Sequence, residues 1–125
     1  MATLFELQNP PFGQLTKTKV IKTENGAHTL TTAEMIEGIV DGTPTGNRAV
    51  TTPTAAAIIS ALGTQGGVGQ TFELTIVNKA TSTHKFTLTA GTGVTIVGDA
   101  DVAAASSGTF LLRVTSSTAV SAFRK

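Results

Sequence analysis

The sequence predicts a mainly β protein: an antiparallel β-sandwich, jelly-roll-like, with two short helices and an extended N-terminal arm. From Val68 to Phe123, short runs rich in Thr, Val, Ile and Phe alternate apolar with polar residues, as do strands that bury one face. Gly, Ser, Asn and Asp separate these runs, which predicts turns between the strands. At 125 residues the chain has room for one modest domain. We expect the arm over residues 1–27 and the β-sandwich domain, with both helices at its start, over residues 28–125.

The first 27 residues differ in composition from the rest. Asn9-Pro10-Pro11-Phe12-Gly13 is incompatible with helix or central strand, and a Pro-Pro pair favours a stiff, extended backbone. An exposed apolar string of this kind is expected to dock onto a partner, and its candidate binding residues are Phe5, Leu7, Pro10, Pro11, Phe12, Lys17 and Lys19. The alternative is a disordered terminus. Asn25-Gly26 is a turn signal, which predicts a hairpin between Lys17–Thr23 and Ala27–Leu30.

A capping box predicts the first helix. The Thr31 hydroxyl can accept from the Glu34 N–H while the Glu34 carboxylate accepts from the Thr31 N–H, and Leu30 and Met35 supply a hydrophobic staple. The helix should therefore begin at Thr32. It should end near Gly38 or Gly42, because glycine is a poor helix former and readily adopts the left-handed cap conformation.

A second helix is expected shortly afterwards. Thr52 is the predicted N-cap and Pro53 the first helical residue, where its missing N–H does no harm. The helix continues through Thr54–Leu62 to Gly63, with Ile58, Ile59 and Leu62 on one side. Residues 41–47 and 63–69 have the composition of loops.

Strands fill the remainder of the chain. They are expected at residues 71–77, 85–89, 94–97, 109–114 and 119–123. Thr89 to Val94 reads as a tight reversal between two antiparallel strands. The apolar face of these strands forms the predicted core: Phe72, Leu74, Ile76, Phe86, Leu88, Val94, Ile96, Phe110, Leu112 and Val114.

Residue types argue against an enzyme and against cofactors or metals. The chain has no cysteine, and its two histidines, His28 and His84, have no nearby acid and hydroxyl that would suggest a nucleophilic triad, so surface or interface positions are expected for both. Asp99 and Asp101 resemble a fragment of a calcium loop but lack its other oxygen ligands, so a turn is expected. The glycine clusters lack the lysine of a phosphate loop and are expected to be turns.

Charge and hydropathy limit the possible partners. The formal net charge of +1 gives no basic footprint for nucleic acid, and no apolar run approaches the ~20 residues that span a bilayer. The N-terminus lacks the pattern of a signal peptide, so we expect assembly inside a cell. Only 14% of the residues are charged and threonine is frequent, which suggests that other protein covers much of the surface.

The order of these segments resembles small structural proteins of tailed phages. The segments are Leu-Thr-Thr-Ala-Glu-Met-Ile from Leu30, Thr-Pro-Thr-Ala-Ala-Ala-Ile-Ile-Ser-Ala-Leu from Thr52, Val68–Asn78, Thr87–Thr95 and Thr109–Thr115. Over about residues 28–123 the chain looks like the capsid decoration, or cement, proteins, including those of cyanophages.

This resemblance implies a β-sandwich on the outer surface of the head, often a homotrimer, with an arm reaching along neighbouring subunits. The expected partners are the major capsid protein and further copies of the chain, and the expected place is the virion, assembled in the host cytoplasm. The alternative is a fibre or tail-associated β-module that binds a host surface receptor. Aromatic residues grouped in loops would favour that alternative, and here the loops are nearly free of them.

Overall fold

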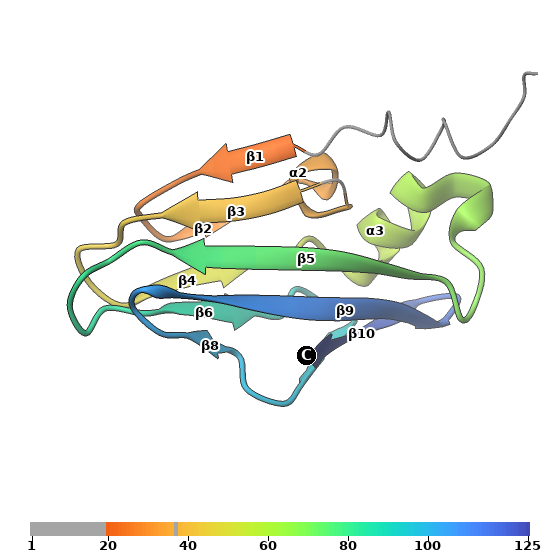
Figure 1. Cartoon of the computed structure of the whole chain (residues 1–125). Helices are drawn as coiled ribbons and strands as arrows, with labels where there is room; N and C mark the ends of the chain where they lie inside the picture. The colour runs from red at the N-terminus through yellow and green to blue at the C-terminus, as the bar shows by residue number, and fades with distance from the viewer. Residues whose placement is uncertain (1–19, 37) are drawn as a thin grey trace, which may run out of the picture.

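A computed structural model of the chain describes residues 20–36 and 38–125. Over these residues the protein is mainly β, with two sheets that enclose a common core (Figure 1). The large sheet consists, in spatial order, of β1 (Val20–Thr23), β3 (Gly38–Gly42), β5 (Thr71–Asn78), β9 (Ser106–Ser116), β10 (Ala119–Arg124) and β7 (Val94–Val97). The small sheet consists of β2 (His28–Thr29), β4 (Arg48–Thr51), β6 (Phe86–Thr89) and β8 (Asp101–Val102).

Both sheets are mixed, which corrects the expectation of a purely antiparallel sandwich; a jelly-roll arrangement is not confirmed. From β1 to β6 the chain alternates between the sheets, running along the large one and returning through the small one. Each strand therefore enters its sheet in the same direction as the previous one, and β1, β3 and β5 are parallel, as are β2, β4 and β6. Antiparallel pairs join β9 to β5 and β10, and β8 to β6.

Two predicted hairpins are wrong for the same reason. Asn25-Gly26 carries the chain from the large sheet to the small one, so β1 pairs with β3 and β2 pairs with β4. The Asn25 side chain accepts from the Thr43 N–H at 2.9 Å, which ties this turn to the next crossing between the sheets. Likewise Gly91–Gly93 connects β6 in the small sheet to β7 in the large one, and the Gly91 N–H donates to the Thr52 hydroxyl at 2.8 Å.

The strand β3 was not expected, because its glycines suggested a helix end. Helix α2 (Thr32–Ile36) does end before Gly38, but β3 begins there at once. At its other end Gly42 approaches β1 so closely that a Cβ would collide with the carbonyl oxygen of Glu24. Glycine at this position permits close contact between neighbouring strands rather than a cap.

The capping box at the start of α2 is confirmed. The Thr31 N–H donates to the Glu34 carboxylate at 2.9 Å, and the Glu34 N–H donates to the Thr31 hydroxyl at 3.2 Å. This carboxylate also lies 3.5 Å from the Lys22 ammonium of β1. The hydrogen bond from the Thr31 backbone, followed by the charge of Lys22, holds the pKa of Glu34 below its usual value.

Helix α3 (Ala55–Leu62) begins later than expected. Its N-cap is Thr54, whose hydroxyl accepts from the Ala57 N–H at 3.1 Å, and a 3-10 turn η1 (Gly63–Gln65) follows it. Thr52 is buried instead, and its hydroxyl donates to the Pro53 carbonyl at 2.8 Å. Helices α2 and α3 contact each other at one end of the two sheets, as Figure 1 shows.

The core lies between the sheets and is closed by Met35 of α2 and by Ala55 and Ile58 of α3. The five predicted strands are all present, and the predicted core residues face this interior, with Phe72 and Ile96 partly buried at its margin. Strand β1 (Val20–Thr23) pairs with β3, so these four residues, which the sequence assigned to the arm, are part of the large sheet.

Candidate protein-binding face

The outer face of the large sheet is the candidate functional surface. Strand register places its outward side chains in rows across the sheet. One row contains Ile21, Ile39, Thr75 and Thr109, and a second contains Glu73, Leu111, Phe123 and Val97. Two further rows flank them: Thr23, Asp41, Val77 and Ser107 on one side, and Thr71, Arg113, Ser121 and Thr95 on the other. The face is therefore a broad surface of threonine, serine and aliphatic side chains with few charges.

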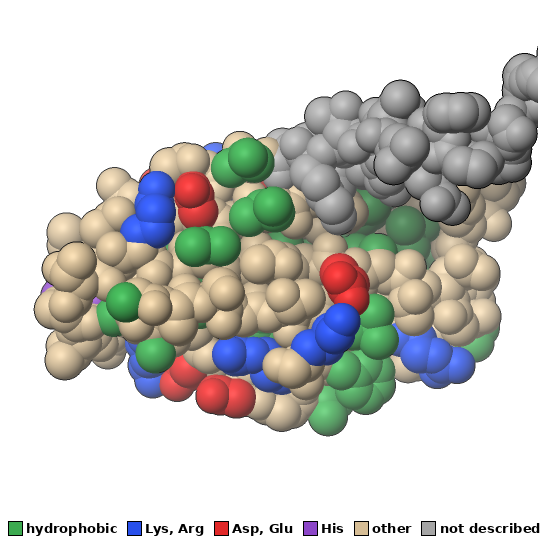
Figure 2. All heavy atoms as spheres, in the orientation of Figure 1, with side chains coloured by type: hydrophobic (Ala, Val, Ile, Leu, Met, Phe, Trp, Pro, Cys, Tyr) green, Lys and Arg blue, Asp and Glu red, His purple; other side chains and the backbone are tan. Residues whose placement is uncertain are grey.

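Apolar side chains gather at the two ends of this face. We define the β1 patch as Ile21, Ile39 and Val77, and the β7 patch as Leu111, Phe123 and Val97. Figure 2 shows hydrophobic groups over β1 and β3 and again toward β10. The exposed fractions are large for apolar side chains: 64% for Ile21, 43% for Val97 and 37% for Phe123. The other three members, Ile39, Val77 and Leu111, are half-buried. Contiguous exposed apolar residues are a general feature of protein-binding surfaces, which makes this face the candidate.

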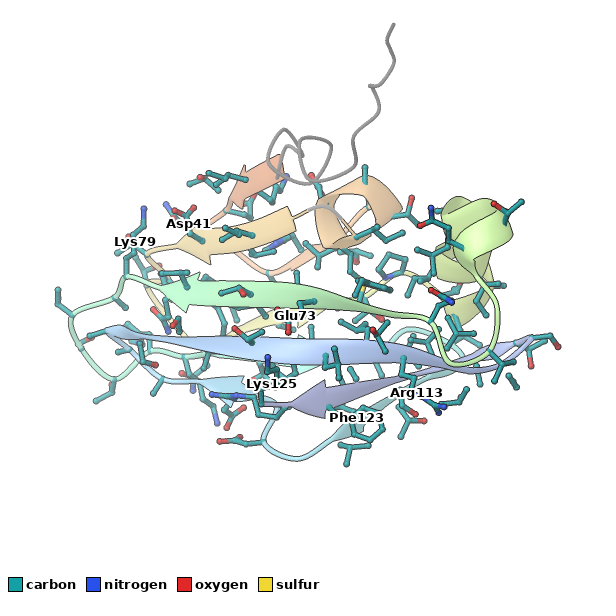
Figure 3. All side chains as sticks on the ribbon, turned by 45° about the vertical axis from the view of Figure 1, so that its right-hand side comes forward. Asp41, Glu73, Lys79, Arg113, Phe123 and Lys125 are labelled. Carbon is teal, nitrogen blue, oxygen red and sulfur yellow. The ribbon has the colours of Figure 1, made fainter. Side chains whose placement is uncertain are left out.

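The band between the patches is polar, and the charge of its carboxylate is neutralised by an ion pair. The Thr75 and Thr109 hydroxyls are 3.0 Å apart and share a hydrogen bond across β5 and β9. Beside them the Lys125 ammonium donates to the Glu73 carboxylate at 2.7 Å, and Figure 3 shows Glu73 and Lys125 side by side on the sheet. Arg113 extends from the same face near Phe123. The band carries both signs of charge and does not select a strongly charged partner.

A second ion pair lies where β3 and β5 end. The Lys79 ammonium is 3.3 Å from the Asp41 carboxylate, and the Thr23 hydroxyl donates to the same carboxylate at 2.7 Å (Figure 3). That hydrogen bond from Thr23, with a smaller contribution from Lys79, lowers the pKa of Asp41. Asp41 is thus an ionised structural acid that joins β1 to β3.

The small sheet carries a separate polar cluster centred on Asp101. Its carboxylate accepts from the Lys85 ammonium at 2.6 Å and from the Thr87 hydroxyl at 2.7 Å. The bond to Lys85, then that to Thr87, and the nearby charge of Arg124 lower the pKa of Asp101. The Arg124 guanidinium donates to the Asp101 carbonyl at 2.6 Å and lies over the Phe110 ring. These contacts join β8 to β6 and to the C-terminal strand.

Asp99, the His28 side chain and the backbone of His84 make local structural contacts. The Asp101 N–H donates to the Asp99 carboxylate at 2.9 Å, as in a turn. His28 Nδ1 lies 2.9 Å from the Gly26 carbonyl, which can only accept, so Nδ1 carries the proton. The His84 carbonyl accepts from the Asn78 side chain at 2.9 Å. Within residues 20–36 and 38–125, no group of three or more His, Cys, Asp or Glu side chains could hold a metal ion.

The predicted arm residues lie outside the described part of the chain; they are Phe5, Leu7, Pro10, Pro11, Phe12, Lys17 and Lys19. The two patches were not predicted from the sequence, because the order of strands, which places Ile21 and Val97 at opposite edges of one face, cannot be read from it. The available signal was the outward apolar residue present in several of the alternating runs, such as Leu111 in Phe110-Leu111-Leu112.

Comparisons of the chain with protein families, with curated proteins and with solved structures gave no match. Among the described residues, no helix is long and apolar enough to cross a bilayer.

Proposed function

We propose that this chain is a non-enzymatic structural protein of a tailed-phage virion, which decorates the outer surface of the head and bridges neighbouring major capsid protein subunits. The observation that carries the proposal is the outer face of the large sheet, where two exposed apolar patches flank a weakly charged Thr-rich band. Such a face is suited to be covered by protein. The sequence resemblance to decoration proteins supports the head as its location.

The mechanism we propose is a clamp. A protein that binds only the assembled shell adds its binding free energy to the assembled state and so opposes its rupture. Individual contacts can be small if several are made at once, because linked contacts act at a high effective concentration. Self-association as a homotrimer and an N-terminal arm reaching a neighbouring subunit would supply this multivalency.

The test is attachment to heads that lack the protein. The full chain should cosediment with purified heads and delay their disruption by heat or osmotic shock. A chain that begins at Lys17 should retain its sheets and core, because the described elements start at Val20, but should bind the heads more weakly. Far-UV circular dichroism of both proteins controls for folding.

Two results would contradict the proposal. Heads that neither retain the protein nor gain resistance to shock would remove the decoration function. Binding to host cells in place of heads would support the alternative, a receptor-binding module of a fibre or tail. Equal occupancy of the truncated and full chains would refute the arm contact alone and leave the sheet face as the attachment surface.

A further inference from the structure

The two open edges of the large sheet are compatible with each other. Strands β1 and β7 end the sheet on either side, and among residues 20–36 and 38–125 no strand pairs with the outer side of either. Each strand has four residues. Following the pairings across the sheet, β1, β3, β5, β10 and β7 all run in one direction and β9 in the other. If a second copy lies beside the first with its strands running in the same direction, β7 of one copy is therefore parallel to β1 of the next.

Backbone groups at the β7 edge have a defined direction. The Val120 N–H of β10 donates to the Gly93 carbonyl at 3.1 Å, and Val120 lies opposite Val94. In a parallel ladder a residue bonds the two residues that flank its partner, so Gly93 and Thr95 direct their groups toward β10. Ile96, in alternation with Thr95, directs its N–H and C=O toward the open edge.

At the β1 edge, the residues whose backbone groups face the open edge have their side chains on the outer face of the sheet. This is the reverse of β7, where Ile96 has its side chain on the inner face. The Glu24 N–H donates to the Asp41 carbonyl at 2.9 Å, and Asp41 lies opposite Thr23. By the same rule Lys22 and Glu24 bond to β3, so Ile21 and Thr23 direct their N–H and C=O groups toward the open edge.

We propose that β7 of one copy adds to β1 of a second copy as a parallel strand, in a head-to-tail contact. The Ile96 N–H would donate to the carbonyl of the second copy's Ile21, and the Ile96 carbonyl would accept from the N–H of its Thr23. This register pairs Ile96 with Lys22 and Val97 with Thr23. Paired residues in a sheet share a face, and here Val97 and Thr23 both lie on the outer face, so hydrogen-bond alternation and side-chain direction agree.

The side chains favour the same partner. In this register Val97 lies opposite Thr23 and Thr95 lies opposite Ile21. The exposed Val97 and Ile21 are therefore diagonal neighbours on the shared outer face, where the β7 patch of one copy meets the β1 patch of the next. Strand β7, Val-Thr-Ile-Val, carries none of the charges or prolines that block edge pairing. On β1 the Lys22 ammonium lies 3.5 Å from Glu34 and 3.9 Å from Glu24, so the contact would not bury an unpaired charge.

The size of the contact predicts how it forms. A four-residue strand is about 13 Å long, and such an edge contact covers less than the roughly 800 Å² per partner of a standard interface. Pairs in dilute solution should therefore be weak. Head-to-tail contacts strengthen when they close into a ring or when copies are concentrated on a surface. This contact would form the interface of the proposed homotrimer, and only the number of copies rests on the proposed function.

Cysteine cross-linking tests the contact, since the chain has no cysteine of its own. A copy carrying Val97→Cys is mixed with a copy carrying Thr23→Cys and oxidised, in concentrated solution and on heads. Directly opposed residues of neighbouring strands are separated by about 4.8 Å, within the range that a disulfide bridges. We expect the mixture to give a covalent dimer at a yield at least about tenfold above that of either variant alone.

Val68→Cys is the matched control, because Val68 is 66% exposed but lies in the loop after η1, away from both edges. Mixed with Thr23→Cys, it should give background cross-linking. In addition, Val97→Lys should weaken self-association, measured by sedimentation, whereas Val68→Lys should not. Circular dichroism confirms that each variant is folded.

The contact is overturned if the mixture does not cross-link above the Val68 control in solution or on heads. It is also overturned if Val97→Cys alone cross-links as well as the mixture, since that indicates a symmetric β7 to β7 contact. Attachment to heads without cross-linking would refute the contact and leave the proposed function standing. Cross-linking without attachment would support the contact and refute the decoration function.

Discussion

Replacement of Leu112 by alanine, compared with replacement of Leu111, tests which face of β9 is buried. Leu112 is fully buried, between Phe72 of β5 and Ala122 of β10, whereas Leu111 points outward between Glu73 and Phe123. The two variants remove the same atoms from adjacent positions of one strand. The difference between them therefore isolates burial.

The expected magnitudes differ severalfold. Leu112→Ala leaves a cavity in the core and should lower the free energy of unfolding by about 3–4 kcal/mol. For a domain of this size that corresponds to a fall in Tm of roughly 10 °C or more. Leu111→Ala removes a partly exposed side chain and should cost about 1 kcal/mol or less.

Urea unfolding followed by far-UV circular dichroism measures both changes, because the chain has no tryptophan or tyrosine to report by fluorescence. An unchanged slope with a shifted midpoint identifies a change in stability alone. Dilute protein keeps self-association out of the measurement. If Leu111→Ala destabilises as much as Leu112→Ala, the outer face is packed against other protein segments and the assignment of an exposed face is refuted.

The remaining predictions concern the capping box and the acid side of the stability profile. Thr31→Ala should lower the free energy of unfolding by about 1 kcal/mol through loss of the cap, and Glu34→Ala should cost less; unchanged midpoints in both variants would show that the cap contributes nothing. The pKa of Asp101 is lowered in the folded state, so its contribution to stability is complete above the ordinary carboxyl pKa near pH 4 and is lost as the pH falls through the lower folded value. Asp101→Asn should therefore be less stable than the parent at pH 7 and show a smaller loss between pH 5 and pH 2; an equal loss in both would assign the acid sensitivity to other groups, such as Asp41.

The sequence by itself determined five of the strands, all after residue 70, together with their inward residues and the start of the first helix. Alternation at period two depends on neighbours along the chain, so the outward and inward residues of Phe110–Val114 could be assigned correctly. The capping box at Thr31 and Glu34 was predictable because both partners lie within one helical turn. Tertiary contacts can also override a local capping signal. Thr52 had the local features of an N-cap, but its hydroxyl donates to the Pro53 carbonyl and accepts from the N–H of the distant Gly91.

Only the tertiary structure decided which strands are neighbours and therefore where the candidate surface lies. A period-two pattern states which side chains of a strand are buried and says nothing about the direction or identity of its partner. That choice depends on the crossings between sheets, such as the turn at Asn25-Gly26, which resembles a hairpin turn locally but leads into a different sheet. The exposure of Ile21 and Val97 follows from their positions on the two edge strands, because an edge position is a property of the whole sheet and of no single segment.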